Sequence, residues 1–274
     1  MPVELPAEDP RFAALCRKIE RDRGFYCSSY KDTCIRRRVS VRMRVKGAAS
    51  FDEYSSLLDQ DSLEYDRLIA TLTINVSRFF RNPETYASIA AKVLPELSER
   101  GIPTIKIWSA GCGFGEEAYS LAVLCHQLGD EHATSRSTKF EIIGTDVDRD
   151  ALAAARRGEY PPGAFIDTAP AVRDVFFPLS DGIHAAVPEL RQRVSFQQAD
   201  LLEASVPARR VHLIVCRNVI IYFRRQAQEA LLERFREALL PGGFLVLGKV
   251  ESLLGKTRDM FAPVSSRERI YRRV

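Results

Sequence analysis

The sequence predicts a doubly wound α/β fold preceded by a small all-helical domain, and three observations support this prediction. An apolar run at 105–108 breaks into closely spaced glycines and then into a helical pattern, as expected for a strand, a tight turn and a helix. Three further apolar runs follow, and polar residues stand at the end of each. Before about residue 73, by contrast, apolar residues recur at helical spacing and no strand pattern is present.

The N-terminal residues predict a series of short helices. Phe12, Leu15 and Ile19 recur at helical spacing, which marks one apolar face. Residues 50–53 have the pattern of a capping box that opens another helix, and 62–72 predicts one more. We therefore expect this part of the chain to form its own helical domain.

Positive charge is concentrated in residues 31–46, where a single acid, Asp32, stands among five arginines. The five are Arg36, Arg37, Arg38, Arg42 and Arg44. A helix with this pattern has one densely basic face, which is either ordinary solvated surface or a surface that attracts an acidic partner. Nucleic acid and an acidic protein surface are both consistent with the charge, and we expect the five arginines to bind a partner.

A connector over 73–81 carries two adjacent phenylalanines among polar residues, which is unusual for a plain linker. We expect it to pack over the ligand site. Asn82 and Pro83 then predict the start of a helix, with Asn82 as its N-cap and Pro83 in the first turn.

The glycine turn at 111–115 indicates what the α/β domain binds. A pyrophosphate site favours a third glycine and a helix N-terminus without acids, but Glu116 and Glu117 follow this turn. Their charge repels phosphate and favours a cation. S-adenosylmethionine fits, because it carries a sulfonium and an ammonium beside its adenosine and has no phosphate. The alternative is that Glu117 only adds favourable charge to a helix start.

The second apolar run, 140–146, ends in Asp146. A carboxylate at the end of the second strand of a doubly wound sheet can accept both hydroxyls of a ribose. Asp146 could instead cap the following helix, but Asp148 is better placed for capping. We therefore assign Asp146 to the cofactor.

The third and fourth runs, 194–199 and 211–216, also end in polar residues. Asp200 and Leu201 follow the third, where a carboxylate oxygen could accept from an adenine amino group. Arg217 and Asn218 follow the fourth. Polar residues thus recur at the same end of successive strands.

Residues 158–193 show little regular spacing of apolar residues, with many prolines and a turn signal at 180–182, so we expect an insertion with a small hairpin.

The predicted domains are 1–75, all helical, and 76–274, which contains the insertion. The remaining elements are a long helix that ends at 241–243, a buried strand over 244–248 and a terminal strand over 269–272.

Composition indicates a soluble, cytoplasmic protein, which we expect to be a monomer. The chain of 274 residues has a formal charge of +4, and no apolar run approaches the roughly 20 residues of a membrane-spanning helix. The N-terminus lacks the pattern of a signal peptide. The six cysteines show no paired spacing and indicate reduced thiols, and the four histidines show no ligand spacing, so no metal site is expected.

Several segments together resemble the chemotaxis receptor methyltransferases, the CheR family. They are 73–81, 111–120, 144–146, 216–223 and 248–253, and the basic stretch 30–44 resembles the N-terminal helix of that family. The resemblance covers essentially the whole chain in the right order. Its motifs Asn-x-[Thr/Ser]-x-Phe-Phe-Arg and Arg-Asn-Val-x-Ile-Tyr-Phe are specific.

The resemblance implies a class I S-adenosylmethionine-dependent methyltransferase with a Rossmann-like sheet. The implied reaction is methyl esterification of glutamate side chains on methyl-accepting chemotaxis receptors, with S-adenosylhomocysteine as product. The positions implied to contact the cofactor are Asn75, Ser77, Arg81, Glu117, Asp146, Asp200, Leu201, Arg217 and Asn218, and we add Gly111 of the glycine turn. Arg81 and Tyr222 match the positions that place the receptor glutamate. The implied partner is the receptor's helical bundle, and some family members also dock a receptor tail peptide.

Some positions depart from the family pattern, and two rival functions follow from other classes. The departures are Ser77 and Asp200, where threonine and asparagine are commoner, Gly113-Phe114, Ala118 and Lys249-Val250.

A nucleic-acid methylase acting on base amino groups needs an Asn-Pro-Pro-Tyr-like motif, which Tyr160-Pro161-Pro162-Gly163 is not. The other rival is a relative that methylates a non-chemotaxis receptor or acts as a non-catalytic regulator. Arg81 could form a structural ion pair and Tyr222 could be a core aromatic.

Overall fold

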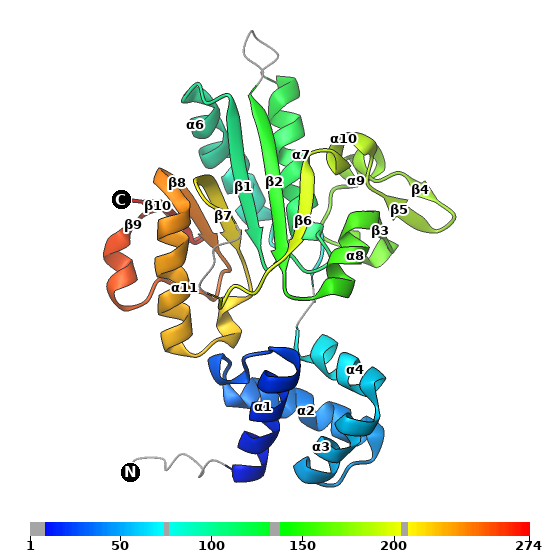
Figure 1. The fold of residues 1–274 in the computed structure, drawn as a ribbon. Coiled ribbons are helices and arrows are strands. Elements are labelled where there is room, and N and C mark those ends of the chain that lie inside the picture. Colours follow the sequence, from blue (N-terminus) through cyan, green and yellow to red (C-terminus); the bar gives the residue numbers. More distant parts are fainter. Residues whose placement is uncertain (1–8, 74–76, 132–137, 204–207) are drawn as a thin grey trace. The chain divides into compact units, whose positions relative to one another are not determined.

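The computed structural model describes residues 9–73, 77–131, 138–203 and 208–274, and the chain packs as two units (Figure 1). The first unit consists of Met1–Ile74 together with Tyr222–Ala227. The second consists of Asn75–Ile221 and Gln228–Val274.

The first unit is helical, as predicted. Its elements are α1 (Pro10–Arg23), η1 (Cys27–Ser29), α2 (Asp32–Lys46), α3 (Phe51–Gln60) and α4 (Ser62–Leu72). Asp9 caps α1 by accepting from the N–H groups of Arg11 and Phe12, and Ser50 caps α3 by accepting from the N–H of Glu53. The apolar faces meet in one core, in which Leu15, Ile19, Val39, Tyr54 and Leu68 are among the most buried side chains.

A short segment from late in the sequence completes this unit. Phe223 forms an antiparallel bridge with Tyr30, and the two rings meet edge to face with centroids 5.0 Å apart. The carbonyl of Tyr222 accepts from the N–H of Lys31 at 2.9 Å. The Arg-Asn-Val-Ile-Ile-Tyr-Phe motif is therefore divided between the two units after Ile221, which the sequence did not indicate.

The second unit contains a twisted sheet in the order β6-β2-β1-β7-β8-β10-β9, counted over the described residues (Figure 1). The strands are β1 (Thr104–Ala110), β2 (Lys139–Asp146), β6 (Val194–Gln198), β7 (Val211–Cys216), β8 (Leu239–Leu247), β9 (Phe261–Ser265) and β10 (Ile270–Arg273). The first five in spatial order are parallel, whereas β10 and β9 are antiparallel additions. This confirms the doubly wound, Rossmann-like prediction. Between β1 and β7 the order reverses, which is where such sheets bind ligands.

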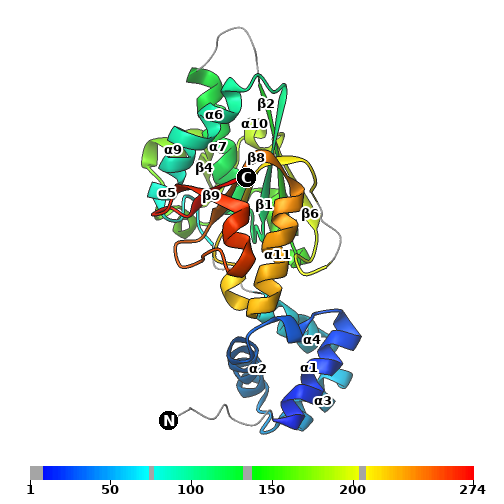
Figure 2. The ribbon, with the colours of Figure 1, turned by 90° about the vertical axis from the view of Figure 1, so that its left-hand side faces the viewer.

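Helices cover both faces of this sheet, and Figure 2 shows α7 (Glu116–Glu131) and α11 (Arg225–Ala238) on opposite sides. Successive side chains along β1 point to opposite faces of the sheet, which explains this arrangement. Ile107 joins the core that contains α7. The next residue, Trp108, packs against Phe235 of α11, with ring centroids 5.4 Å apart. The other helices are α5 (Pro83–Ser88), the π-helical η2 (Ile89–Val93), α6 (Leu94–Glu99) and α8 (Arg149–Arg157), with the 3-10 turns η4 (Ile220–Tyr222) and η5 (Gly255–Met260). A sheet buried on both faces needs almost continuous apolar strands, and β7 is buried along its whole length.

The predicted insertion is present as a separate small antiparallel sheet. It contains β3 (Glu159–Tyr160), η3 (Pro162–Phe165), α9 (Pro170–Phe176), β4 (Leu179–Ser180), β5 (Ile183–Ala185) and α10 (Pro188–Arg191). Asp181 and Gly182 both have positive φ, as a tight turn between β4 and β5 requires. The predicted hairpin is thus extended by a third strand, β3, which pairs with β5.

One predicted boundary needs correction, and one strand was missed. Residues 241–243 do not end the long helix, because α11 ends at Ala238 and β8 already begins at Leu239. The strand β9 was not predicted, since its alternation is broken by Pro263.

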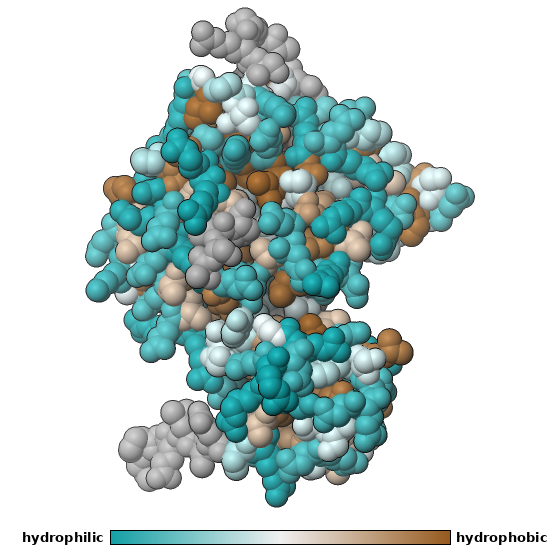
Figure 3. Space-filling model, viewed as in Figure 1, coloured by the Kyte–Doolittle hydropathy of each residue, from teal (hydrophilic) through white to brown (hydrophobic). Residues whose placement is uncertain are grey.

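Among the described residues, no helix combines the length and apolar composition that crossing a membrane requires. On the face shown in Figure 3, hydrophilic residues predominate and exposed apolar residues are scattered.

Candidate functional site

The glycine turn lies between the ends of β1 and β2. The carbonyl of Thr145 accepts from the N–H groups of Gly111, at 2.8 Å, and Cys112, at 2.9 Å. Gly111 has a φ of 77°, and a Cβ at this position would lie 2.6 Å from Cγ2 of Val219. Only glycine allows both the conformation and the close approach, so the turn brings the ends of β1, β2 and the loop after β7 together.

Asp146 at the end of β2 holds the glycine turn in place. Its Oδ2 accepts from the N–H of Gly113 at 2.8 Å, and its Oδ1 accepts from the N–H of Asp148 at 3.0 Å. Burial raises the pKa of this carboxyl, against these hydrogen bonds. Asp148 caps α8 instead, as predicted, by accepting from the N–H groups of Asp150 and Ala151. The role of Asp146 toward a ribose stays a prediction.

Glu117 is a buried carboxylate in the first turn of α7. Its Oε1 accepts from the hydroxyl of Ser109 at 2.8 Å, and its Oε2 lies 3.9 Å from Nη1 of Arg217. Burial raises the pKa of Glu117 to about 7, although the charges of Arg217 and Arg81 oppose this increase. A cation placed beside this buried carboxyl group would stabilise its charged form.

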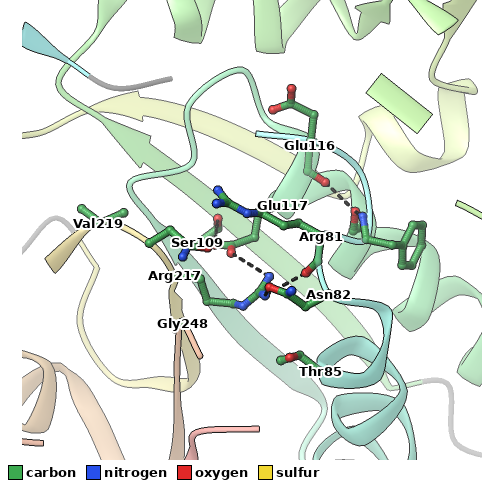
Figure 4. A network of polar contacts seen from close by, with 12 residues as sticks. Arg81, Asn82, Thr85, Ser109, Glu116, Glu117, Arg217, Val219 and Gly248 are labelled. Atoms are coloured by element: carbon green, nitrogen blue, oxygen red, sulfur yellow. Dashed lines mark hydrogen bonds and ion pairs between the residues drawn. The ribbon is translucent and has the colours of Figure 1, made fainter. Parts of the chain in front are cut away.

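Arg217 joins the end of β7 to the connector, as Figure 4 shows. Its Nη2 donates to the carbonyl of Arg81 at 2.7 Å and to Oδ1 of Asn82 at 2.8 Å, and its guanidinium lies over the ring of Tyr86. Asn82 is the N-cap residue of α5 and Pro83 lies in its first turn, as predicted, but the Asn82 side chain makes no capping hydrogen bond, because its Oδ1 binds Arg217. Arg217 thereby fixes the backbone that carries Arg81.

Ser77 is held at the start of α7 by a side-chain hydrogen bond with Glu116, whose pKa burial raises to about 7. Sequence reasoning used Glu116 only as a charge that repels phosphate and did not predict this contact. Asn75, predicted to bind the cofactor, lies outside the described residues.

The phenylalanines of the connector are buried. Phe79 donates its N–H to the carbonyl of Ala164 at 3.0 Å and stacks on Phe165 of the insertion with centroids 4.4 Å apart. Tyr160, in the same aromatic cluster, donates its hydroxyl to the carbonyl of Phe114 at 2.8 Å. The connector, the insertion and the glycine turn are therefore packed as one body. That the connector covers the ligand remains a prediction.

Asp200 and Leu201 follow β6 at the same edge of the sheet. Oδ1 of Asp200 accepts from the N–H of Leu202 at 2.8 Å, and burial raises the pKa of this carboxyl. Leu201 is buried. Their predicted contact with adenine is compatible with this position and stays a prediction.

Asn218 adopts a φ of 60°, and its buried Oδ1 has no hydrogen-bond partner among the described residues. Glu251 lies buried beside it and accepts from the Asn218 N–H at 3.0 Å. Glu251 lies within the segment 248–253 that resembles the family, but the sequence pattern predicted no role for it. The available signal was an acid placed four residues after a buried strand, at the edge where the other polar residues gather.

Tyr222, predicted to be catalytic, belongs by its contacts to the helical unit. The guanidinium of Arg38 lies over its ring, 5.4 Å from the centroid. Arg38 also donates to the carbonyls of Thr71 and Leu72 at the end of α4. The catalytic role of Tyr222 stays a prediction.

The other arginines of α2 differ in what they contact. Arg42 forms a two-pronged ion pair with the buried Glu64, with 2.9 Å between Nε and Oε1, and Arg36 lies over the ring of Phe12. Arg37 and Arg44 are exposed. The predicted partner-binding face therefore includes arginines that also stabilise the helical unit, which the charge pattern alone did not reveal.

The assembled site suits a cationic ligand with hydroxyl groups. Buried carboxylates lie at the ends of β1 and β2. Of the eight buried side-chain polar atoms without a hydrogen-bond partner in the described residues, three belong to this site: Oε2 of Glu116, Nε of Arg217 and Oδ1 of Asn218. Buried polar groups in native proteins are normally hydrogen-bonded, so a ligand is the simplest way to satisfy atoms gathered in this way. The donor set fits S-adenosylmethionine. Within the described ranges, no cluster of three His, Cys, Asp or Glu side chains is placed to hold a metal ion.

Two family models match the chain. One, described as CheR methyltransferase, SAM binding domain, matches residues 75–270, and the other, described as CheR methyltransferase, all-alpha domain, matches 10–73. A chemotaxis protein methyltransferase of Listeria monocytogenes is 32% identical over 91% of this chain and 93% of its own length. Chemotaxis protein methyltransferase 2 of Pseudomonas aeruginosa is 33% identical over 89% and 86%. An uncharacterized 104.1 kDa protein of Rhodobacter capsulatus is 34% identical over 88% of this chain, which spans 25% of that protein.

Proposed function

The chain belongs to the CheR methyltransferase family, binds S-adenosylmethionine, and, we propose, transfers a methyl group to glutamate side chains of chemotaxis receptors in the cytoplasm. The products would be a glutamyl methyl ester and S-adenosylhomocysteine. The names of the relatives support the receptor as substrate.

The observation that carries the proposal is the arrangement of Arg81, Arg217 and Glu117. Arg217 holds the backbone of Arg81, and the guanidinium of Arg81 lies close enough to Glu117 to oppose the increase in its pKa. A guanidinium near a buried carboxylate can orient a second, incoming carboxylate through charge-assisted hydrogen bonds. We assign Arg81 to this role.

The reaction requires alignment more than proton transfer. S-adenosylmethionine supplies, when bound, a methyl group on a positively charged sulfur. A glutamate side chain is already ionised near pH 7, so it needs no general base. Arg81 would align the carboxylate, and the phenol of Tyr222 would donate a hydrogen bond to it. The groups that would bind and orient the cofactor are Glu117, Asp146 and the loop of Arg217.

The direct test uses the full chain with S-adenosylmethionine labelled in its methyl group and membranes that contain the cell's own receptors. We expect label on the receptor that alkali releases as methanol, because methyl esters are cleaved by base and methylated amines are not. Arg81→Ala should abolish the transfer. Tyr222→Phe should lower kcat while the cofactor Kd stays within about twofold, since the phenol is assigned to the receptor glutamate.

Other outcomes separate the rival functions. Alkali-stable label would exclude glutamate esterification, and transfer to nucleic acid would identify a different substrate. Cofactor binding without any transfer to receptor-containing membranes would support a regulatory relative. Equal loss of cofactor affinity and kcat in Tyr222→Phe would show that Tyr222 stabilises the fold.

A further inference from the structure

Glu251 gathers four backbone N–H groups around one buried carboxylate. Its Oε2 accepts from Gly248 at 2.5 Å and from Asn218 at 3.0 Å, and its Oε1 accepts from Val219 at 2.9 Å and from Ile221 at 3.4 Å. The side chain is 3% exposed. Three of the four donors come from the loop that follows β7, so one side chain satisfies the polar backbone of that loop.

The loop needs such an acceptor. Asn218 has a φ of 60°, a conformation that costs free energy for a residue with a side chain unless the surroundings hold it in place. Successive N–H groups turned toward one point also form a concave site that favours an anion. Glu251 provides this anion from within the chain, so the strained conformation of Asn218 is maintained by a residue 33 positions later.

The surrounding packing leaves the carboxylate little freedom. A Cβ on Gly248 would lie 2.7 Å from Oε2 of Glu251 and 2.8 Å from the backbone nitrogen of Asn218. On the other side of the loop, a Cβ on Gly111 would lie 2.6 Å from Cγ2 of Val219. The loop is therefore held between the end of β8 and the glycine turn, with space for glycine alone at both contacts.

We propose that Glu251 is a positioning residue for the cofactor: through its bonds to the loop it sets the Asn218 side chain, whose buried Oδ1 is left for a ligand donor. The inference rests on the proposed role of Asn218 in binding S-adenosylmethionine. Glu251 itself touches no reacting group in this assignment.

The test compares S-adenosylmethionine affinities by calorimetry for the full chain and the variant Glu251→Gln. The amide group of glutamine places N–H donors against backbone N–H donors, so we expect the cofactor Kd to rise by about tenfold or more. Glu268→Gln is the matched control, because Glu268 is similarly buried in the same unit but contacts Thr85, at 2.7 Å, Lys249 and Arg267, whereas Glu251 binds the loop after β7. Both variants should lower the melting temperature, and only Glu251→Gln should raise Kd.

A double-mutant cycle separates positioning from general damage. If Glu251 acts through Asn218, Glu251→Gln should change the Kd of an Asn218→Ala protein by less than about twofold. The same factor in both backgrounds, or an unchanged Kd in Glu251→Gln, would overturn the inference. If Glu251→Gln does not fold, Glu251→Asp serves instead, since it keeps the charge and shortens the side chain, which withdraws the carboxylate from the N–H groups of the loop. Wild-type protein that fails to bind S-adenosylmethionine would refute the proposed function itself.

Discussion

Glu116 and Glu117 are adjacent carboxyl groups that differ in their partners and share a pKa of about 7. Glu116 has a side-chain hydrogen bond with Ser77, whereas Glu117 accepts from Ser109 and faces Arg217. In both, burial is the main cause of the high pKa, because the charged form loses its hydration. Both therefore titrate near pH 7, and a bound cation would shift them toward the charged form.

This leads to a prediction about pH. A cationic ligand beside Glu117 lowers the pKa of that group, so S-adenosylmethionine should bind more tightly as pH rises from about 6 to 8, with release of protons. Calorimetry in two buffers of different ionisation enthalpy measures the protons released. Glu117→Gln should bind more weakly and flatten the dependence. Affinity independent of pH in the wild type would contradict the placement of a cation here.

Glu116 and Glu117 also make the free energy of unfolding depend on pH, but in the opposite direction to cofactor affinity. Their pKa in the folded chain lies above the ordinary value of 4.5, so the folded state binds more protons than the unfolded state between about pH 4.5 and 7. Their contribution to the free energy of unfolding should decrease as pH rises through this interval. Saturating cofactor should reduce the decrease.

Asp146 and Asp148 allow a matched comparison. Asp146→Ala removes a buried acceptor from the glycine turn and, in our assignment, from the ribose, so cofactor binding should weaken by about 1.5–3 kcal/mol, roughly ten- to hundredfold. Asp148→Ala removes the side chain that caps α8 and should lower stability by about 1 kcal/mol with little effect on Kd. Calorimetry and thermal unfolding on both variants provide the check. Unchanged affinity in Asp146→Ala would refute the ribose assignment.

At the scale of elements, α2 combines two roles in one basic helix. Arg42 neutralises the buried Glu64, and Arg38 donates to the carbonyls at the end of α4. Arg37 and Arg44 are exposed and are better placed to meet a partner. Charge density alone could not separate the two groups, because the partners of Arg38 and Arg42 lie on another helix.

We predict that the double variant Arg37→Glu, Arg44→Glu raises the KM for receptor several-fold and flattens its dependence on salt, since an acidic receptor surface would no longer be attracted. Cofactor Kd and melting temperature should stay near wild type. Arg42→Ala is the control and should destabilise the helical unit by about 3–5 kcal/mol, because it leaves Glu64 buried without its main partner. Tight binding of nucleic acid at physiological salt, with receptor methylation unaffected, would instead mean that α2 binds phosphate.

At the scale of the whole molecule, the chain folds as two units with separate cores. Every assigned cofactor contact among the described residues lies in the second unit. Cofactor at a hundred times its Kd should therefore stabilise that unit by about 2.7 kcal/mol. Hydrogen exchange should show added protection in β1, β2 and the loop after β7. Protection confined to α1–α4 would place the ligand elsewhere.

Local patterns in the sequence determined the fold class, the helical N-terminal part, the central strands and the acids at their ends. These features depend on periodicity and on residue types within a few positions, which a sequence displays directly. The glycine turn followed by glutamates also indicated a cationic cofactor, because charge and backbone freedom are local properties.

Only the tertiary structure decided which polar groups are hydrogen-bond or ion-pair partners. Arg217 binds the carbonyl of Arg81 and the side chain of Asn82, Glu251 holds the loop of Asn218, and Phe223 pairs with Tyr30 within the helical unit. Each of these contacts joins residues far apart in the sequence, and no periodic pattern records them. Hydrogen bonds and ion pairs depend on distances of a few ångströms, which exist only once the chain has packed.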